Sequence, residues 1–347
     1  MTDAAAALCE RLGIEFPILS AGMGDVAGAD LVIAVSEAGG LGVLGGAERE
    51  PEDLRAEIRR VKAGTSRPFG VDLLLAAAES TEDTVPADAG LPAFAYGSKV
   101  RRQVQVMFEE DVPIFVSGLG NPAPFMAEAK NRGMTVLSLV GTVHAAERVA
   151  AAGVDYVIAQ GSEAGGHTGR VATMALVPAI ADAVDVPVLA AGGIADGRGI
   201  LAALALGAAG VWIGTRFVAT IESHAHESFK RQILQAGSSD TTVTRAYTGK
   251  TARAIVNEYT KRWDASSEPP KAFPQQFMES RENFHGAMEH GDTVNGFMPA
   301  GQIAGIITDL PSAGDVVRRM VAEVDQAYAA LGARMAAFGT AVAGGER

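Results

Sequence analysis

Length, composition and charge exclude several classes of protein before any motif is considered. The chain has 347 residues, of which 48% are hydrophobic, and its formal net charge is −12 at pH 7. Binding to the phosphates of a nucleic acid needs a concentrated basic face. The sequence has no such cluster of basic residues, so we expect no nucleic-acid partner. The longest apolar runs, such as Ile200 to Leu206, are far too short to cross a bilayer, so we expect no membrane partner.

The cysteine content and the first ten residues indicate a reducing compartment. Cys9 is the single cysteine, so no internal disulfide can form, and no Cys/His cluster has the spacing of a zinc site. Residues 1–10 lack the basic region followed by an apolar stretch that marks a secretory signal. We therefore expect a cytoplasmic protein without a bound metal.

Short apolar runs recur along the first two thirds of the chain. Most of them close on glycine or a polar residue, and most are followed by a stretch of helical composition. The eight strands predicted in this way are Phe16 to Gly22, Gly40 to Gly46, Pro68 to Leu75, Val112 to Gly118, Met134 to Val140, Tyr156 to Gly161, Pro187 to Gly193 and Gly210 to Phe217.

Seven predicted helices lie between these strands. They are Ala29 to Ala38, Pro51 to Ala63, Lys99 to Glu110, Pro122 to Arg132, Val143 to Ala152, Ala175 to Ala183 and Gly197 to Leu206. Regular alternation of strand and helix predicts a parallel α/β sheet, and eight strands in succession favour closure into a (β/α)₈ TIM barrel. An open doubly wound sheet is disfavoured because the glycines at Gly22, Gly24 and Gly28 do not have the spacing of a dinucleotide-binding turn.

The pattern changes after the eighth predicted strand. Glu222 to Ala236 and Thr251 to Trp263 have helical composition, Thr241 to Lys250 is turn-like, and Ser266 to Pro274 is rich in proline. We expect residues 219–300 to form a helical cap inserted after strand eight. Residues 1–218 with 301–336 would form the barrel, including a terminal helix from Ala313 to Leu331, and residues 337–347 would be a flexible tail.

Glycines at the ends of the last two predicted strands indicate a phosphate site. Gly192 and Gly193 follow strand seven, and Gly214 with Thr215 lies at the end of strand eight. Barrel enzymes place their sites at the carboxyl ends of the strands, and strands seven and eight are the usual phosphate position. Exposed backbone N–H groups next to a helix N-terminus bind phosphate well, so these residues predict a phosphorylated cofactor.

The loop after strand six contains the candidate catalytic residue. Residues 160–169 include Gly161, Gly165, Gly166 and Gly169, with His167 among them. Glycines let the backbone approach a flat ligand, and a histidine there can move protons near neutral pH. We therefore expect His167 to be the acid/base residue, and we expect the other five histidines to be structural or exposed.

These residues, and others along nearly the whole chain, carry a resemblance to a known family. The matching blocks are Phe16-Pro17-Ile18, Ala21-Gly22-Met23, Gly39 to Gly42, Phe69-Gly70-Val71, Gly118 to Pro122, Glu163 to His167, Ala190 to Ile194, Gly214 to Phe217 and Ala300-Gly301-Gln302. The sequence resembles the nitronate monooxygenase family, formerly called 2-nitropropane dioxygenases, which is related to the FMN-dependent enoyl-ACP reductases. The Glu-Ala-Gly-Gly-His block is the most specific of these motifs.

The resemblance implies FMN as cofactor and assigns roles to individual residues. Ala21, Gly22 and Met23 would line the flavin ring, and Gln160 would contact the cofactor, as would the backbone at Gly165 and Gly166. Gly192, Gly193, Gly214 and Thr215 would hold the FMN phosphate. His167 would act on the substrate over the flavin, and Gln302 would close over the same site.

Two departures from the family pattern leave the substrate open. Asp72 stands where the family often has Asn, and an acid near a phosphorylated cofactor is unfavourable unless it is paired or displaced, so Asp72 is left out of the FMN set. Thr168 stands where many nitronate-oxidising members have Arg. Gly-Gly-His-Thr-Gly also resembles members that act on acyl-CoA in ring degradation.

The resemblance leaves three functions open, two enzymatic ones with a small-molecule substrate and one without catalysis. Nitronate oxidation with O₂, which gives a carbonyl compound and nitrite and needs no NAD(P)H, is favoured on the breadth of the family. The alternative is reduction of enoyl thioesters or quinones with NAD(P)H as reductant, and a third is a flavin-binding protein without catalysis. A chemistry like that of IMP dehydrogenase needs a nucleophilic cysteine after a barrel strand, whereas Cys9 precedes the first one.

The cap leaves two further questions open in the sequence. The predicted helix Glu222 to Ala236 either caps the site or makes a homodimer contact. Lys250 and Arg253 could attract an anionic substrate, but we expect them to be solvated surface charges.

Overall fold

Eight parallel strands form the centre of the protein, and each coincides with one of the predicted strands. The computed structural model describes residues 2–47, 49–75 and 93–344. The strands are β1 (Ile18–Ser20), β2 (Gly42–Gly45), β3 (Phe69–Leu74), β4 (Ile114–Leu119), β5 (Thr135–Val140), β6 (Tyr156–Gln160), β8 (Val188–Ala191) and β9 (Gly210–Ile213). Almost every residue in them is buried, as expected for parallel strands covered on both faces.

The sheet is nearly closed into a barrel, as predicted. Its strand order is β1-β9-β8-β6-β5-β4-β3-β2, so β1 and β2 are its two ends. These ends meet at an isolated parallel bridge between Leu19 and Leu41. There, Ser20 N–H donates to Leu41 O and Leu41 N–H donates to Ile18 O, both at 2.9 Å.

Helices surround the strands at the predicted places. They are α2 (Ala29–Glu37), α3 (Pro51–Gly64), α4 (Ala93–Glu109), α5 (Met126–Asn131) with the preceding 3₁₀ turn η4 (Ala123–Phe125), α6 (Val143–Ala151), α7 (Thr173–Ala181) and α8 (Gly197–Ala205). Thr142 caps α6 and Asp196 caps α8, each accepting a backbone N–H bond at the helix start. A further helix, α1 (Asp3–Leu12), buries Leu8 and Leu12 in an apolar cluster with residues of the strands.

The predicted eighth strand is too long at its carboxyl end. β9 ends at Ile213, Gly214 has right-handed helical dihedral angles, and Thr215–Val218 forms the short helix α9. A cause is the burial of Arg216, which donates to Asp309 Oδ1 and to the carbonyl oxygens of Ala219 and Asp309. These bonds require the chain to turn where an apolar pattern alone predicts extended backbone.

The inserted segment is not purely helical. The predicted turn from Thr241 begins with strand β10 (Thr241–Thr244), and the predicted helix from Thr251 begins with strand β11 (Ala252–Ile255). β11 pairs antiparallel with β10 and also with β7 (Gly166–His167), a two-residue strand in the glycine-rich loop. Only the second half of that predicted helix is helical, as α11 (Glu258–Asp264), and α10 (Glu227–Gln235) begins five residues later than predicted.

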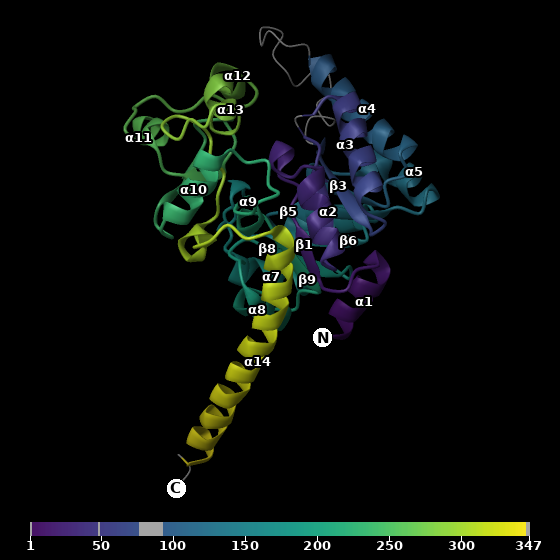
Figure 1. Ribbon diagram of the computed structural model, residues 1–347, viewed down its shortest axis with the longest axis vertical. Helices are drawn as coiled ribbons and strands as arrows, with labels where there is room; N and C mark the ends of the chain where they lie inside the picture. Colours follow the sequence, from purple (N-terminus) through teal and green to yellow (C-terminus); the bar gives the residue numbers. More distant parts are fainter. Residues whose placement is uncertain (1, 48, 76–92, 345–347) are drawn as a thin grey trace.

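The inserted segment, which we call the cap, has an aromatic core of its own. Its remaining helices are α12 (Gln275–Glu279) and α13 (Arg281–Glu289), followed by the 3₁₀ helix η5 (Gln302–Ile306). Tyr247 is buried, with ring centroids 4.8 Å from Tyr259 and 4.7 Å from Phe297. Helices α10 to α13 gather on one side of the barrel, at the upper left in Figure 1.

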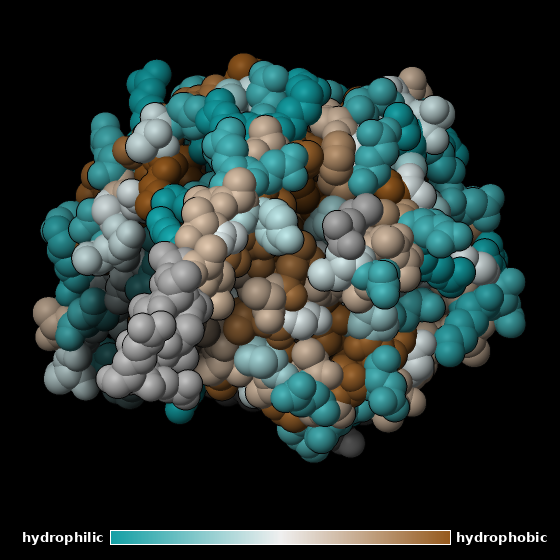
Figure 2. Space-filling model, turned by 90° about the horizontal axis from the view of Figure 1, so that it is seen from below, coloured by the Kyte–Doolittle hydropathy of each residue, from teal (hydrophilic) through white to brown (hydrophobic). Residues whose placement is uncertain are grey.

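The terminal helix α14 (Ala313–Gly344) is longer than predicted. Its first half packs against α8 and α2 and buries Val317 and Met320. Its second half leaves the barrel and projects from the molecule (Figure 1). Figure 2, which views the molecule from below, shows apolar surface in the middle of the face from which the helix projects. The helix continues past Leu331, where the sequence predicts its end, and residues 345–347 lie outside the described residues. Among the described residues, no helix is both long and apolar enough to span a membrane.

Candidate functional site

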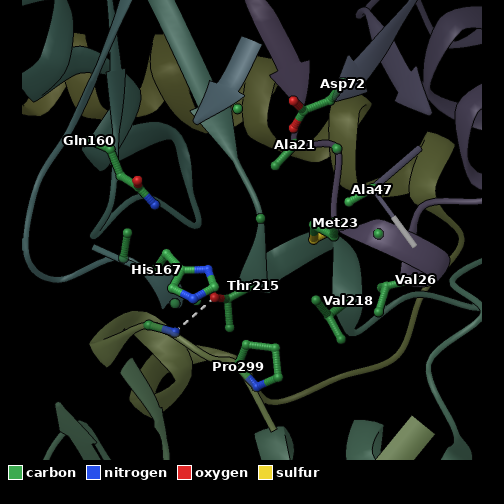
Figure 3. A pocket seen from close by; sticks show the side chains of 18 of the residues that line it. Ala21, Met23, Val26, Ala47, Asp72, Gln160, His167, Thr215, Val218 and Pro299 are labelled. Carbon is green, nitrogen blue, oxygen red and sulfur yellow. Dashed lines mark hydrogen bonds between the residues drawn. The ribbon is translucent and has the colours of Figure 1, made fainter. Parts of the chain in front are cut away.

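A cavity of about 330 Å³ opens at the carboxyl ends of the barrel strands, beneath the cap. It brings together His167 and all of the predicted cofactor residues except Gln302. Those lining the cavity are Ala21, Gly22, Met23, Gln160, Gly165, Gly166, Gly192, Gly193, Gly214 and Thr215. Figure 3 shows Asp72 and Ala21 at one end of this space and His167, Thr215 and Pro299 at the other.

The loop after β1 and the strand β3 approach each other closely at one end of the cavity. A Cβ atom on Gly22 would lie 2.3 Å from Asp72 Cβ, and one on Gly118 would lie 2.5 Å from Asp72 Oδ1. Such distances exclude any side chain at either glycine. The two glycines therefore let three segments of backbone form one surface that a flat ring can approach.

Asp72 is a cavity residue that the sequence analysis left out. The side chain is 6% exposed, the backbone N–H of Gly118 donates to its carboxyl group, and Oδ1 has no partner within the described part of the chain. Burial raises the pKa of Asp72 well above its ordinary value. The objection to an acid at this place was its charge, and the raised pKa weakens that objection because it favours the neutral form of the carboxyl group.

Two adjacent strand ends form a cradle of backbone groups. Gly192 and Gly193, after β8, have φ values of 95° and 75°, which side chains other than glycine rarely adopt. Gly214 follows the neighbouring strand β9, and Thr215 begins α9. Glycine backbone at two neighbouring strand ends is suited to a phosphate group.

Glu163 fixes the glycine-rich loop to this cradle. Its Oε2 accepts bonds from both the N–H of Thr173, at 2.8 Å, and the Thr173 hydroxyl, at 2.9 Å. Thr173 Oγ1 also lies 3.0 Å from Gly192 O. Glu163 and Thr173 together thus join the loop after β6, the start of α7 and the end of β8.

His167 projects into the cavity from the junction of barrel and cap. It lies in β7, opposite Ala252 of β11, and its Nε2 is 3.0 Å from Thr248 Oγ1. Burial, and secondarily the positive charge of Lys250, lower the pKa of His167 to about 4. The imidazole is therefore neutral near pH 7 and able to accept a proton.

The segment 299–302 closes over the glycine-rich loop. Gly301 N–H donates to Thr215 Oγ1 at 2.9 Å, and Gln302 N–H donates to Glu163 O at 3.0 Å. A Cβ atom on Gly165 would lie 2.7 Å from Ala300 backbone atoms. The closing residues are Pro299, Gly301 and Ile303, whereas the side chain of Gln302 is exposed and does not line the cavity.

The outer wall of the cavity is aromatic, which the sequence analysis missed. Four of the 13 phenylalanines fall between residues 273 and 297, and this concentration was the available signal. All four line the cavity, together with Phe229 of α10: they are Phe273, Phe277, Phe284 and Phe297. The rings of Phe277 and Phe284 are nearly perpendicular, at an interplanar angle of 82° and a centroid distance of 5.0 Å.

Neither Lys250 nor Arg253 is the solvated surface charge that was expected. Lys250 lines the cavity, with its Nζ 4.6 Å from the centre of the Phe273 ring. Arg253 is 8% exposed and donates to Ser162 O and Thr241 Oγ1, so it joins the cap to the glycine-rich loop. His285, expected to be structural or exposed, also lines the cavity.

Comparisons with known proteins agree with this architecture. A model of the nitronate monooxygenase family matches residues 5–323. A (3aS,4S,5R,7aS)-5-hydroxy-7a-methyl-1-oxo-octahydro-1H-indene-4-carboxyl-CoA dehydrogenase of Mycobacterium tuberculosis is 36% identical, over 90% of this chain and 94% of that protein.

Two solved structures are similar over almost their whole length. FabK from Thermotoga maritima has a TM-score of 0.83 at 36% identity, covering 94% of this chain and 98% of its own. A nitroalkane oxidase from Streptomyces ansochromogenes has a TM-score of 0.82 at 32% identity, covering 94% and 99%. The chain belongs to the nitronate monooxygenase family and is a flavin-dependent oxidoreductase.

Proposed function

We propose that this enzyme uses FMN to oxidise or reduce a bulky apolar acyl-CoA thioester. The observation that carries the proposal is the aromatic outer wall, because it continues directly from the glycine-lined end of the cavity. A ring-containing acyl group can be held against the phenylalanines while its carboxyl end reaches His167. Such apolar walls with few polar groups are typical of small-molecule sites.

The residues of the cavity fit FMN. Ala21, Gly22 and Met23 line the end of the cavity where a flat ring would lie, and Gly192, Gly193 and Gly214 supply a cradle for a phosphate. In its protonated form, which burial favours, Asp72 could donate a hydrogen bond to a ring carbonyl or nitrogen through its unpartnered oxygen. When bound, FMN supplies hydride exchange, and the protein supplies orientation and electrostatics.

His167 moves the proton in this proposal. Removal of a hydride and a proton from adjacent carbons creates a double bond, and His167 accepts the proton because its imidazole is neutral. In the reducing direction the same residue returns the proton. The charge of Lys250, close enough to depress the pKa of His167, also favours an anionic substrate or enolate beside the ring.

Relatives support this substrate class. The Mycobacterium tuberculosis protein is named as a dehydrogenase of a ring-containing carboxyl-CoA, and a Rhodococcus jostii protein of the same name is 33% identical over 96% of this chain.

Nitronate oxidation is the second candidate. A neutral histidine beside a lysine suits a nitronate anion as well as an enolate, and a nitroalkane oxidase is among the similar structures. A small alkyl nitronate, however, would fill little of the space beside the phenylalanine wall.

Anaerobic flavin bleaching tests the choice. FMN-loaded protein would be mixed separately with NADH, NADPH, an alkyl nitronate, and a saturated carbocyclic acyl-CoA, and the visible flavin absorbance followed. Bleaching by the thioester, or bleaching by a nicotinamide nucleotide that the matching enoyl-CoA reverses, supports the proposal. Bleaching by the nitronate with no response to either thioester would replace it with nitronate oxidation.

A further inference from the structure

A threonine of the cap contacts the proposed acid/base residue. Thr248 is 3% exposed, and its Oγ1 lies 3.0 Å from Nε2 of His167. The other ring nitrogen, Nδ1, makes no hydrogen bond within the part of the chain that the structure describes. In Figure 3 the imidazole ring lies between Gln160 and Thr215 at the edge of the cavity. The two nitrogens of His167 therefore have different surroundings, and Nδ1 is the one left for a ligand.

Thr248 lies in a turn that is closed by two hydrogen bonds. Gly249 N–H donates to Arg245 O, and Nε of the Arg245 guanidinium donates to Gly249 O, both at 2.8 Å. Gly249 has a φ of 76°, and a Cβ atom there would lie 2.5 Å from Lys271 O. The turn is therefore packed tightly against the segment that leads to Phe273 of the aromatic wall.

The glycine-rich loop is fixed to the chain that follows this turn. His167 of β7 lies opposite Ala252 of β11, and Thr168 N–H donates to Thr251 O at 3.2 Å. Because β11 follows the turn directly, the pairing of the two strands sets the distance between Thr248 and the imidazole. The contact thus follows from the way in which the cap is joined to the barrel.

The hydrogen bonds of the Thr248 hydroxyl determine which ring nitrogen carries the proton. A hydroxyl group has one hydrogen to donate and two lone pairs to accept with. Thr248 Oγ1 accepts from Lys250 N–H at 3.2 Å and donates to Lys250 O at 3.3 Å. Its second lone pair then accepts Nε2–H of His167, so every donor and acceptor of the hydroxyl is used. If the hydroxyl donated to Nε2 instead, Lys250 O would lose this bond and one lone pair would have no donor.

We propose that Thr248 is a positioning residue that keeps the proton of neutral His167 on Nε2, so that Nδ1 is the atom that exchanges a proton with the substrate. The bond that one ring nitrogen makes sets the state of the other. Nδ1 accepts the proton that leaves the substrate carbon, and it returns that proton in the reducing direction. Nε2–H donates to Thr248 in both states, so neither group has to turn between them. This inference rests on the acid/base role proposed for His167 and holds for either candidate substrate.

Nitrogen NMR tests the position of the proton directly. The sample is the FMN-loaded protein with isotope-labelled histidine, and the signals of His167 are those missing from His167→Ala. Near pH 7 we expect Nε2 to give the signal of a protonated ring nitrogen and Nδ1 that of an unprotonated one. A proton on Nδ1 instead would overturn the inference, whichever substrate the enzyme uses.

The rate of flavin reduction at saturating substrate measures the consequence for the reaction. Thr248→Val removes the hydroxyl and nearly keeps the shape, so the rate should fall about tenfold, the effect of one lost hydrogen bond, with little change in KM. Thr248→Ser keeps the hydroxyl and should restore most of the rate. Thr244→Val is the matched control, because Thr244 is also buried and its Oγ1 accepts Ala246 N–H at 3.0 Å, away from His167. It should keep the wild-type rate.

A wild-type rate in Thr248→Val, or an equal loss in Thr248→Ser or in Thr244→Val, would each overturn the inference. Failure of the proposed function gives a different result. An undiminished rate in His167→Ala would remove the acid/base role itself. A loss in His167→Ala without a loss in Thr248→Val would leave that role intact and reject only the part assigned to Thr248.

Discussion

His167 lies where the barrel and the cap meet, and both sides shape its chemistry. The barrel loop supplies the residue, while Thr248 and Lys250 of the cap supply its hydrogen bond and part of its pKa shift. A pKa of about 4 keeps the imidazole neutral over the physiological range. A neutral imidazole can accept a proton from the substrate, as the proposed role of His167 requires.

Replacement of His167 should separate catalysis from binding. His167→Ala should lower kcat by about 100- to 10,000-fold, the usual contribution of a positioned acid/base group, while FMN stays bound. Steady-state rates and flavin absorbance measure the two effects. His144→Ala, on the exposed face of α6, is the control and should match wild type. An unaffected rate in His167→Ala would favour a flavin-binding protein without catalysis.

Asp72 should impose a pH dependence on the stability of the flavin-free protein. Its pKa is higher in the folded than in the unfolded state, so folding favours the protonated form. The stability that protonated Asp72 contributes to the folded protein is fully present below the unfolded pKa of about 3.9. It is lost as the pH rises through the pKa of Asp72 in the folded protein.

Asp72→Asn should remove this dependence. We expect the free energy of unfolding to rise near pH 8, because the variant avoids the cost of burying a carboxyl group that is ionised in the unfolded chain, and to change little near pH 4. Thermal melting of both proteins at the two pH values gives the difference. An equal gain at both pH values would show that Asp72 is not the titrating group.

At the scale of elements, the glycine-rich loop and the segment 299–302 act as one clamp. Gly165→Ala should push them apart, because its Cβ would come 2.7 Å from Ala300 backbone. We expect FMN affinity to fall at least about tenfold, or about 1.4 kcal/mol. Gly286→Ala in α13, where the new Cβ meets only ordinary contacts, is the control in the same flavin titration.

The cap should decide substrate size. Phe277→Ala removes one ring of the aromatic wall and should raise KM for a carbocyclic thioester by about tenfold, as expected for lost apolar burial of roughly 1–3 kcal/mol. Its KM for a short alkyl nitronate should change less, because a small ligand makes fewer contacts with the aromatic wall. Equal effects on both substrates would assign Phe277 a structural role.

The elements also differ in how far the sequence could predict them. All eight barrel strands were predicted, because burial on both faces leaves apolar runs between helices. Strands β10 and β11 were not, since Thr241–Thr244 is short and polar and is held by pairing within a sheet that includes Gly166 and His167. Pairing across that distance in sequence overrides local preference.

The residues of the candidate site also differ in how far the sequence could predict them. The glycines of the cradle and His167 could be located because strand ends meet at one face of a barrel. The raised pKa of Asp72 depends on burial against Gly22 and Gly118, which belong to two other segments, and no local pattern in the sequence reports it. The exposed side chain of Gln302 likewise depends on how η5 packs, whereas its neighbours line the cavity.

At the scale of the whole molecule, the cavity draws residues from most strand ends and from the cap. A ligand that fills it should therefore stabilise the entire chain. At a free FMN concentration of 100 times Kd we expect the free energy of unfolding to increase by about 2.7 kcal/mol and the melting temperature to rise. Riboflavin, which lacks the phosphate, should stabilise much less if the cradle holds that group. Equal shifts with both ligands in a thermal melt would remove the phosphate role from Gly192, Gly193 and Gly214.

The join between the two ends of the barrel has a consequence for biosynthesis. β1 and β2 share only an isolated bridge, and α14 packs across this region against α2 and α8. Synthesis proceeds from the N-terminus, so every strand leaves the ribosome before the helix that covers their join. All the barrel strands are therefore synthesised before the last tenth of the chain, which contains α14. Until α14 is made, the join between β1 and β2 lacks its covering helix, and chaperones can act on the nascent barrel during that time.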